Sequence, residues 1–151
     1  MPRAYVGLGA NLGNREEALE QAVALLEATE RVDVIAVSEL RETDPVGFLD
    51  QPRFLNGAAV VETTLSAREF LDTLLAIERS LGRVRVERWG PRIVDLDLLV
   101  YSDEIVDEPG LRVPHPRLHE RRFALEPLVE LDPELVIPGR GRASELLAAL
   151  H

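Results

Sequence analysis

The sequence predicts an α+β fold, with an antiparallel sheet that has helices packed on one face and its active site on the other. Three observations carry this prediction. Strand-like and helical segments alternate in the order β-α-β-β-α-β, followed by short helices. The two main helical segments are amphipathic and begin with capping residues, and turn residues bound the β-branched segments. This order is the split-βαβ, ferredoxin-like pattern, which places both main helices on the same side of the sheet.

The first part of the chain supplies a strand, a helix and a second strand. Residues 4–9 are apolar and run into a glycine-containing turn, which is typical of a strand. Asn14 can cap a helix with Glu17 as its partner, and apolar residues recur at helical spacing through residues 15–29. Residues 31–40 are apolar and β-branched, and they predict the second strand.

The middle of the chain supplies the third strand and the second helix. Residues 42–52 contain prolines and a glycine without periodicity, which predicts a long loop, and residues 54–64 predict the third strand. Ser66 and Glu69 form a capping box for a helix that Gly82 is expected to end. The buried face of this helix is expected to consist of Phe70, Leu71, Leu74, Ile77 and Leu81.

The last part of the chain supplies the fourth strand and two more helices. Residues 83–92 predict a second loop and residues 93–101 a strand, with helices expected near residues 123–131 and over residues 143–150. No repeat or linker interrupts the pattern. We therefore expect one domain over residues 1–151, which is long enough for a single core.

Composition excludes several classes of function. The formal net charge of -10 argues against general affinity for nucleic acid, and no apolar run reaches the length of a membrane span. The chain has no Cys, so it has neither a disulfide framework nor a thiol nucleophile, and all 17 basic residues are Arg, which excludes a P-loop lysine. We recognise no signal peptide, and the cytoplasm is the expected location.

Two carboxylates spaced by one residue are the main functional signal. Residues two apart in a strand point to the same face, so Asp95 and Asp97 lie side by side while Val94, Leu96 and Leu98 point away. Adjacent like charges repel, and a hard cation such as Mg²⁺ offsets that repulsion. The alternative is an edge strand charged for solubility, but the apolar run around the pair is typical of a central strand.

Arginines gather just before the two aspartates. Arg83, Arg85, Arg88 and Arg92 lie within ten residues, and a guanidinium group binds phosphate oxygens in bidentate fashion. The alternative is a solvated loop whose surface ion pairs contribute little. The neighbouring carboxylate pair favours phosphate binding and thus nucleotide chemistry. Glu78 borders the apolar face of the preceding helix, and we expect its carboxylate to pair with this loop.

Five further positions allow both a structural and a functional interpretation. Trp89 lies in a Gly-Pro loop, where burial and contact with a ligand are equally compatible with the pattern. Asn56 faces the same side of its strand as Phe54 and suits the edge of a heterocycle, although core packing is the default for Phe54 and Phe123. His115 lies between two prolines, where a structural hydrogen bond is the simpler role.

The motif Arg88-x-Gly90-Pro91-Arg92-x-x-Asp95-Leu96-Asp97-Leu98-Leu99 resembles the signature of the 6-hydroxymethyl-7,8-dihydropterin pyrophosphokinase family. The chain departs from the family pattern at Ala10, which replaces a common Ser, at Phe54, which replaces a frequent Tyr, and at Pro116, which replaces an aromatic residue that contacts ATP. The resemblance covers nearly the whole chain through Gly9-Ala10-Asn11-Leu12-Gly13, Asp50-Gln51-Pro52-x-Phe54-Leu55-Asn56, Gly82-Arg83-Val84-Arg85, Val113-Pro114-His115-Pro116, Arg121 and Phe123.

The resemblance implies transfer of pyrophosphate from ATP to the hydroxymethyl group of the dihydropterin, with release of AMP, in folate biosynthesis. It implies two Mg²⁺ ions held by Asp95 and Asp97, with Arg83 and Arg92 as further catalytic residues. The expected partners are these two small molecules, without nucleic acid or membrane, and the expected state is a monomer. The implied pterin-binding residues are Thr43, Val46, Phe54, Asn56, Trp89 and Phe123, and the implied ATP-binding residues are Arg83, Arg85, Arg88, Trp89, Arg92, Leu98, Arg112, His115 and Arg121.

Two other functions share part of this pattern. A nucleotidyltransferase also pairs an Asp-x-Asp with a glycine-containing turn, but there the turn lies shortly before the aspartates, and here residues 9–13 are far from them in sequence. A ferredoxin-like small-ligand sensor binds its ligand at a subunit interface and needs no metal pair.

Overall fold

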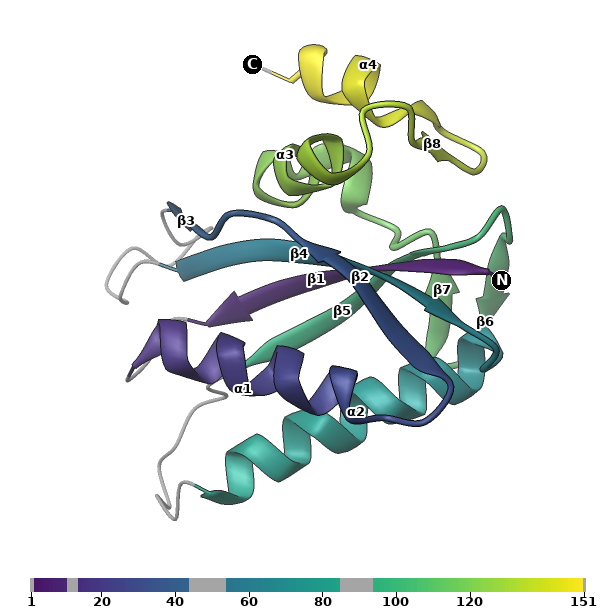
Figure 1. The fold of residues 1–151 in the computed structure, drawn as a ribbon. Helices are drawn as coiled ribbons and strands as arrows, with labels where there is room; N and C mark the ends of the chain where they lie inside the picture. The colour runs from purple at the N-terminus through teal and green to yellow at the C-terminus, as the bar shows by residue number, and fades with distance from the viewer. Residues whose placement is uncertain (1, 11–13, 44–53, 85–93, 151) are drawn as a thin grey trace.

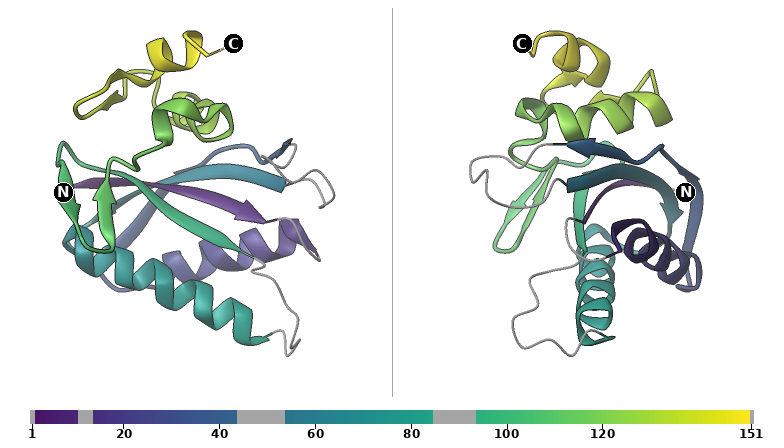
Figure 2. Two further views of the ribbon diagram at one scale, coloured as in Figure 1. Left: turned by 180° about the vertical axis from the view of Figure 1, so that it is seen from behind. Right: turned by 90° about the vertical axis from the view of Figure 1, so that its left-hand side faces the viewer.

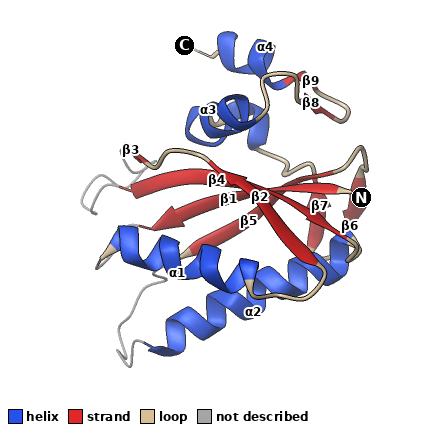
Figure 3. Cartoon of the chain, in the orientation of Figure 1, coloured by secondary structure: helices blue, strands red, loops and turns tan. Residues whose placement is uncertain are grey.

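The computed structural model describes residues 2–10, 14–43, 54–84 and 94–150, except for the side chains of residues 83 and 84. Its centre is a sheet with the strand order β2-β4-β1-β5, in which all neighbouring strands are antiparallel (Figures 1 and 3). This arrangement confirms the predicted α+β, ferredoxin-like fold. Its elements are β1 (Arg3–Ala10), α1 (Arg15–Glu27), β2 (Val32–Val37), β4 (Phe54–Thr63), α2 (Ala67–Val84) and β5 (Asp95–Tyr101).

Shorter elements complete the fold. β3 pairs with β4 beyond the end of β2, and β6 and β7 form a hairpin after β5. Within the described ranges, no helix is long and apolar enough to cross a membrane. The bounds of these elements are β3 (Arg41–Thr43), β6 (Val106–Glu108), β7 (Leu111–Val113), η1 (Leu118–Glu120), α3 (Arg122–Leu131), β8 (Val136–Ile137), β9 (Gly141–Arg142) and α4 (Ala143–Ala148).

Both long helices begin at the predicted caps. Asn14 Oδ1 accepts the backbone N–H of Glu17 at 3.1 Å, and Ser66 and Glu69 exchange backbone-to-side-chain hydrogen bonds of 2.9 and 3.1 Å. These bonds satisfy amides that have no partner inside the first helical turn. The predicted apolar face of α2 is buried against the sheet, through Phe70, Leu74, Ile77 and Leu81, with Leu71 partly buried.

The first core lies between the sheet and the pair α1 and α2. Alternate residues of β1 and β5 point into it, among them Val6, Leu8, Leu96 and Leu98, and all four are buried. Val94 joins the same core. The predicted division of β5 into an apolar face and a carboxylate face is therefore confirmed on its apolar side.

A second core lies on the opposite face, under α3 and α4 (Figures 1 and 2). Tyr5 and Val60 from the sheet pack here with Leu125 and Leu128 from α3. These sheet residues lie near one end of β1 and β4. The C-terminal elements therefore cover only part of this face, and the other ends of the strands are left for a site.

Two element boundaries differ from expectation. α2 does not end at Gly82 but continues to Val84, because a glycine costs only about 1 kcal/mol in helix propensity and does not interrupt the helical hydrogen bonds. The second strand ends at Val37, where Ser38 begins to bond with Ala58. The Ser38 N–H donates to Ala58 O and the Ala58 N–H donates to Ser38 Oγ, both at 2.9 Å. β3 then overlaps the start of the loop that was expected over residues 42–52.

The position of β5 also differs from expectation. β5 lies at the edge of the sheet, although its apolar run predicted a central strand. Leu96 and Leu98 are buried in the first core, and Leu99 and Val100 are buried in the second. Burial on both faces therefore explains the apolar run without a neighbour on each side.

Tyr5 joins the sheet to α3, and its titration makes the stability of the protein fall at alkaline pH. Its hydroxyl donates to Oδ2 of Asp132, which caps the C-terminal end of α3, at 2.8 Å. Burial, followed by the hydrogen bond and charge of Asp132, raises the pKa of Tyr5 to about 12. The unfolded chain loses this proton near pH 10 and the folded chain retains it. Stability is therefore complete below pH 10 and falls as the pH rises towards 12.

Tyr5→Phe is expected to lower the free energy of unfolding near neutral pH by about 1 kcal/mol, because one hydrogen bond is lost. It should also reduce the loss of stability above pH 10. The chain has no Lys and no Cys, so its two tyrosines dominate side-chain titration there, and the remaining slope belongs to Tyr101. Urea unfolding at about pH 8 and about pH 11 measures both effects. An equal alkaline loss in variant and wild type would contradict the role of Tyr5.

Candidate active site

A cleft of about 570 Å³ lies between the uncovered part of the second sheet face and the segment from His115 to Glu126. Residues of β1, β3, β4 and β5 form its floor, and η1 with the first turns of α3 forms its opposite wall. Figure 1 shows these elements from the side, with α3 above the sheet. Residues that are far apart in sequence therefore meet at one place.

The two aspartates lie in this cleft, opposite two glycines. Asp95 is the register partner of Gly9 and Asp97 is the partner of Gly7, and all four residues line the cleft. A Cβ at Gly9 would lie 3.2 Å from Asn56 Oδ1, and one at Gly7 would lie 3.3 Å from Leu99 Cδ1. Because glycine adds no side chain here, the floor of the cleft stays open beside the carboxylates.

The carboxylate pair suits Mg²⁺ in its chemistry. Asp95 is half-buried and Asp97 is exposed, and both present oxygen ligands at the cleft. Among the described residues, no three His, Cys, Asp or Glu side chains form a group that could hold a metal. This donor set fits Mg²⁺, which is commonly bound by one or two carboxylates and completes its shell with water and substrate phosphates.

Glu78 holds the strand segment between the two aspartates. Its Oε2 accepts the backbone N–H of Leu96 at 2.7 Å, across from α2 to β5. Among the described strands β5 has a neighbour on one side only, so no strand supplies an acceptor for this amide. The arginine loop that we expected to pair with Glu78 lies outside the described residues. Sequence spacing could not reveal the bond to Leu96, because it depends on where α2 lies beside the sheet.

Polar and aromatic groups occupy the β3 and β4 side of the cleft. Phe54 and Asn56 line it from β4, and the Asn56 amide donates to Thr43 Oγ1 on β3. Phe123 lines the cleft from the first turn of α3, with the guanidinium carbon of Arg121 5.6 Å from the centre of its ring. Phe54 and Phe123 thus lie on opposite walls, and we call the space between them the aromatic slot.

His115 lines the cleft near Asp97, and hydrogen bonds fix its orientation. Its backbone N–H donates to Leu99 O at 2.8 Å, and its Nδ1 accepts the backbone N–H of Arg117 at 3.2 Å. Burial lowers the pKa of His115, Arg121 and Arg117 lower it further, and Asp97 opposes them. The imidazole is therefore neutral near pH 7 and carries its proton on Nε2, which leaves one donor for a ligand.

The remaining residues named from the sequence are not brought into the cleft or are not described. The Leu98 side chain is buried in the first core, so only its backbone can reach a ligand at the site. Arg112 lies on β7, where its Nε is 3.2 Å from Asp107 Oδ1. Arg83 lies in the last turn of α2, where only its backbone is described. Val46, Arg85, Arg88, Trp89 and Arg92 lie outside the described residues.

Four charged residues of the cleft were missed by the sequence analysis. Arg117, Glu120, Arg122 and Glu126 all line it, from the segment that follows His115. Their spacing corresponds to no motif and no amphipathic pattern. Only the placement of η1 and α3 over the sheet turns these side chains towards the site.

Glu78→Ala is expected to destabilise the protein by about 1–3 kcal/mol, because the partly buried Leu96 amide loses its acceptor. Glu78→Gln keeps an acceptor oxygen and should lose less. Thermal unfolding compares the two variants with wild type, and the exposed Asp72→Ala on the same helix serves as the control. If the Ala and Gln variants were both as stable as the control, the hydrogen bond to Leu96 would contribute nothing.

Comparison with known proteins identifies the family. The model of the family described as 7,8-dihydro-6-hydroxymethylpterin-pyrophosphokinase matches residues 5–133. The 2-amino-4-hydroxy-6-hydroxymethyldihydropteridine pyrophosphokinase of Pseudomonas aeruginosa is 45% identical over 147 residues, which are 97% of this chain and 91% of the relative. The protein of the same name from Bacillus subtilis is 50% identical over 128 residues, which are 85% of this chain and 77% of the relative.

Solved structures share the fold. The wild-type HPPK-DHPS of Plasmodium falciparum superposes with a TM-score of 0.78 at 16% sequence identity. The alignment covers 97% of this chain and 44% of the other, so this chain spans less than half of that protein. The carboxylate pair, the aromatic slot and the resembling segments all fall within the matched residues 5–133. This chain belongs to the 7,8-dihydro-6-hydroxymethylpterin-pyrophosphokinase family.

Proposed function

We propose that the cleft binds both substrates of the family reaction, with the pterin in the aromatic slot and the ATP phosphates beside the aspartates. As a member of the family, the chain is an enzyme that transfers pyrophosphate from ATP to the hydroxymethyl group of 6-hydroxymethyl-7,8-dihydropterin in folate biosynthesis. One observation carries the proposed placement: Asp95, Asp97, Phe54 and Phe123 all line the same cleft. A phosphate donor and a flat heterocycle can therefore meet there.

The pterin half of the proposal rests on shape and hydrogen bonding. Phe54 and Phe123 offer two ring faces for stacking on a flat heterocycle. Asn56 is 8% exposed and already donates one hydrogen bond to Thr43, which fixes its orientation. Its Oδ1 and remaining N–H then present an acceptor and a donor to the pterin edge. We assign Val46 and Trp89 to the same half from the family resemblance.

Asp95 and Asp97 are the proposed ligands of two Mg²⁺ ions. Bound there, the ions would neutralise charge on the phosphate oxygens and lower the pKa of the pterin hydroxyl. The backbone of β5 fixes the position of both carboxylates. Glu78 on α2 holds β5 through its hydrogen bond to the Leu96 amide.

The phosphate half requires positive charge and hydrogen-bond donors. We assign Nε2–H of the neutral His115 and the Arg121 guanidinium to the ATP phosphates, since both line the cleft, His115 near Asp97 and Arg121 near His115. Arg83 and Arg92 are assigned to the charge that develops on the transferred group, and Arg85, Arg88 and Trp89 to ATP, from the family resemblance. Leu98, through its backbone, and Arg112 are assigned to the adenosine side.

The reaction is then an in-line displacement. The pterin hydroxymethyl oxygen bonds to the β-phosphorus and loses its proton, while the bond from that phosphorus to the α–β bridging oxygen breaks and AMP leaves. The cleft residues contribute by positioning and by charge stabilisation, because phosphoryl-type transfer needs little covalent help from the protein.

The proposal extends to the form of the enzyme. The two cores share one sheet, which supports one catalytic domain over residues 1–151, and we propose that this domain acts as a monomer. The net charge of -10 supports an enzyme without nucleic-acid affinity, and the absence of Cys suits the cytoplasm.

The product nucleotide distinguishes the proposed reaction from its alternatives. Purified protein incubated with Mg²⁺, ATP and 6-hydroxymethyl-7,8-dihydropterin should release AMP and pterin diphosphate in equal amounts, measured by chromatography. Release of ADP would indicate transfer of a single phosphoryl group, and release of pyrophosphate would indicate nucleotidyl transfer. Binding without any turnover would favour a sensor.

Asp97→Ala is expected to abolish turnover while the fold is retained, because the substitution removes a metal ligand but also relieves like-charge repulsion on β5. AMP release and thermal unfolding measure the two effects. The exposed Asp33→Ala on β2, away from the cleft, serves as the matched control. Full activity in the Asp97 variant would contradict the metal assignment.

A further inference from the structure

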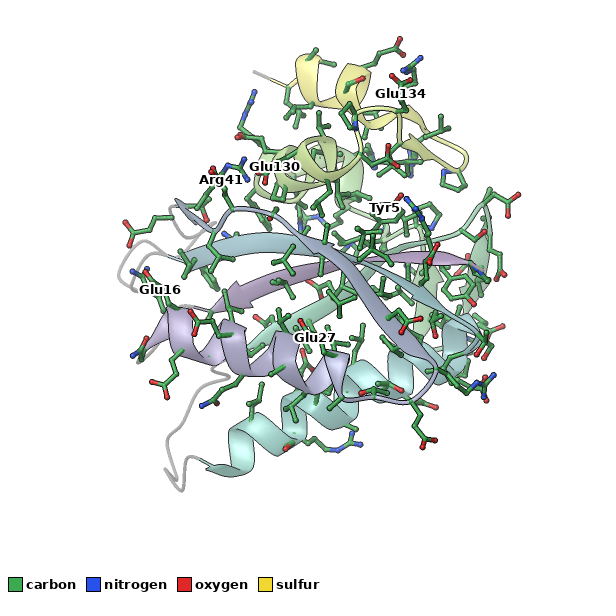
Figure 4. The ribbon with its side chains drawn as sticks, in the orientation of Figure 1. Tyr5, Glu16, Glu27, Arg41, Glu130 and Glu134 are labelled. Carbon is green, nitrogen blue, oxygen red and sulfur yellow. The ribbon has the colours of Figure 1, made fainter. Side chains whose placement is uncertain are left out.

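Glu130, near the end of α3, binds the segment that joins β2 to β3. Its Oε2 accepts the backbone N–H of Glu39 at 2.9 Å, and its Oε1 accepts the guanidinium of Arg41 in an ion pair. Figure 4 shows Arg41 and Glu130 next to each other between β3 and α3. We call this pair of contacts the Glu130 clamp.

The clamp joins the two walls of the aromatic slot. Arg41 begins β3, where it is the register partner of Asn56, and Thr43 is the partner of Phe54. On the other side, Glu130 follows Phe123 by seven residues, which is about two helical turns and places both on one face of α3. The same helix face thus presents an aromatic ring to the cleft and a carboxylate to β3.

α3 also contacts β4 and β1 of the sheet, through the second core and through Asp132. Leu125 and Leu128 pack on the second core, and Asp132 accepts the Tyr5 hydroxyl on β1. β3 itself has three residues, and β4 is its partner among the described strands. So short a strand has little stability of its own, and a contact with α3 therefore has a large influence on where it lies.

We propose that the Glu130 clamp sets the position of β3 against α3 and so defines the aromatic slot, which makes Glu130 a positioning residue for the pterin. This inference rests on the proposed placement of the pterin. The clamp lies on the β3 side of β4, and β5 with the carboxylate pair lies at the other edge of the sheet beyond β1. Loss of the clamp should therefore weaken pterin binding and leave the binding of the ATP phosphates unchanged.

The exposure of the clamp agrees with a positioning role. The Arg41 and Glu130 side chains are 34% and 32% exposed, and ion pairs this accessible contribute little to global stability. Arg41 Nη1 is buried and has no hydrogen-bond partner among the described residues. Arg41→Met loses the ion pair with Glu130, but it also removes this unpaired buried donor. The two effects on the free energy of unfolding therefore offset each other. Clamp variants should therefore remain folded.

The test compares Glu130→Ala, Glu130→Gln and Arg41→Met in the full chain. Pterin affinity is measured in the presence of Mg²⁺ and a non-hydrolysable ATP analogue, together with kcat, KM for each substrate and Tm. Glu134→Ala is the matched control, because Glu134 also accepts an arginine, Arg142, at 2.6 Å but lies beyond α3 from the slot (Figure 4).

Glu130→Ala is expected to raise the Kd and KM for the pterin about fivefold or more, with KM for ATP and Tm close to wild type. Glu130→Gln retains an acceptor for the Glu39 N–H and should recover part of the affinity. Arg41→Met should weaken pterin binding and add little to the effect of Glu130→Ala in the double variant, because both act through one contact. The Glu134 control should bind both substrates normally.

An unchanged pterin Kd in Glu130→Ala would overturn the inference. Parallel rises in both KM values with a lower Tm would also overturn it, because they would show a general structural role. Phe54→Ala and Phe123→Ala separate this failure from failure of the proposed site. If these two lose pterin affinity and Glu130→Ala does not, only the clamp is wrong. If they bind the pterin normally, the slot assignment is wrong and the clamp proposal falls with it.

Discussion

Two carboxylates lie at neighbouring same-face positions of β5, and their mutual repulsion is the constraint around which the cleft is built. Asp95 and Asp97 repel each other, and among the described strands β5 has a partner on one side only. Glu78 supplies the missing bond on the other side by accepting the Leu96 amide between them. Beside the pair, Gly7 and Gly9 leave the floor of the cleft open, which gives the proposed phosphate-bound cations room to reach carboxylates that the backbone of β5 holds in place.

The second face of the sheet carries a hydrophobic core at one end and the cleft at the other. At one end of the strands, Tyr5 and Val60 are covered by α3 and form a core. At the other end, the positions of the same periodicity hold glycines, an amide and the carboxylates, which form the cleft. α3 belongs to both halves, because Leu125 and Leu128 anchor it and Phe123 stands at the cleft. The site is therefore built on a helix whose position is set by the hydrophobic core.

Sequence patterns predicted most elements because those signals are local. The caps at Asn14 and Ser66 and the alternation around Asp95 depend on residues at most four apart, and the structure confirms them. The errors concern features with weak or ambiguous local signals. Gly82 was expected to end a helix that continues past it, and the apolar run of β5 was taken for a central strand. A strand that is buried on both faces has the same apolar composition whether it lies at the centre or at the edge of the sheet.

For the site, residue types and spacing identified the carboxylate pair and suggested Asn56, and the family resemblance added Phe54, Phe123, His115 and Arg121; all of them line the cleft. Spacing alone could not identify Arg117 or the partners of Glu78 and Glu130. Each of these depends on how close two elements come that are separated in sequence: η1 over the sheet, α2 beside β5, and α3 against β3. Periodicity along the chain encodes which face a side chain occupies, but what it meets there is set by the packing of whole elements on the two cores.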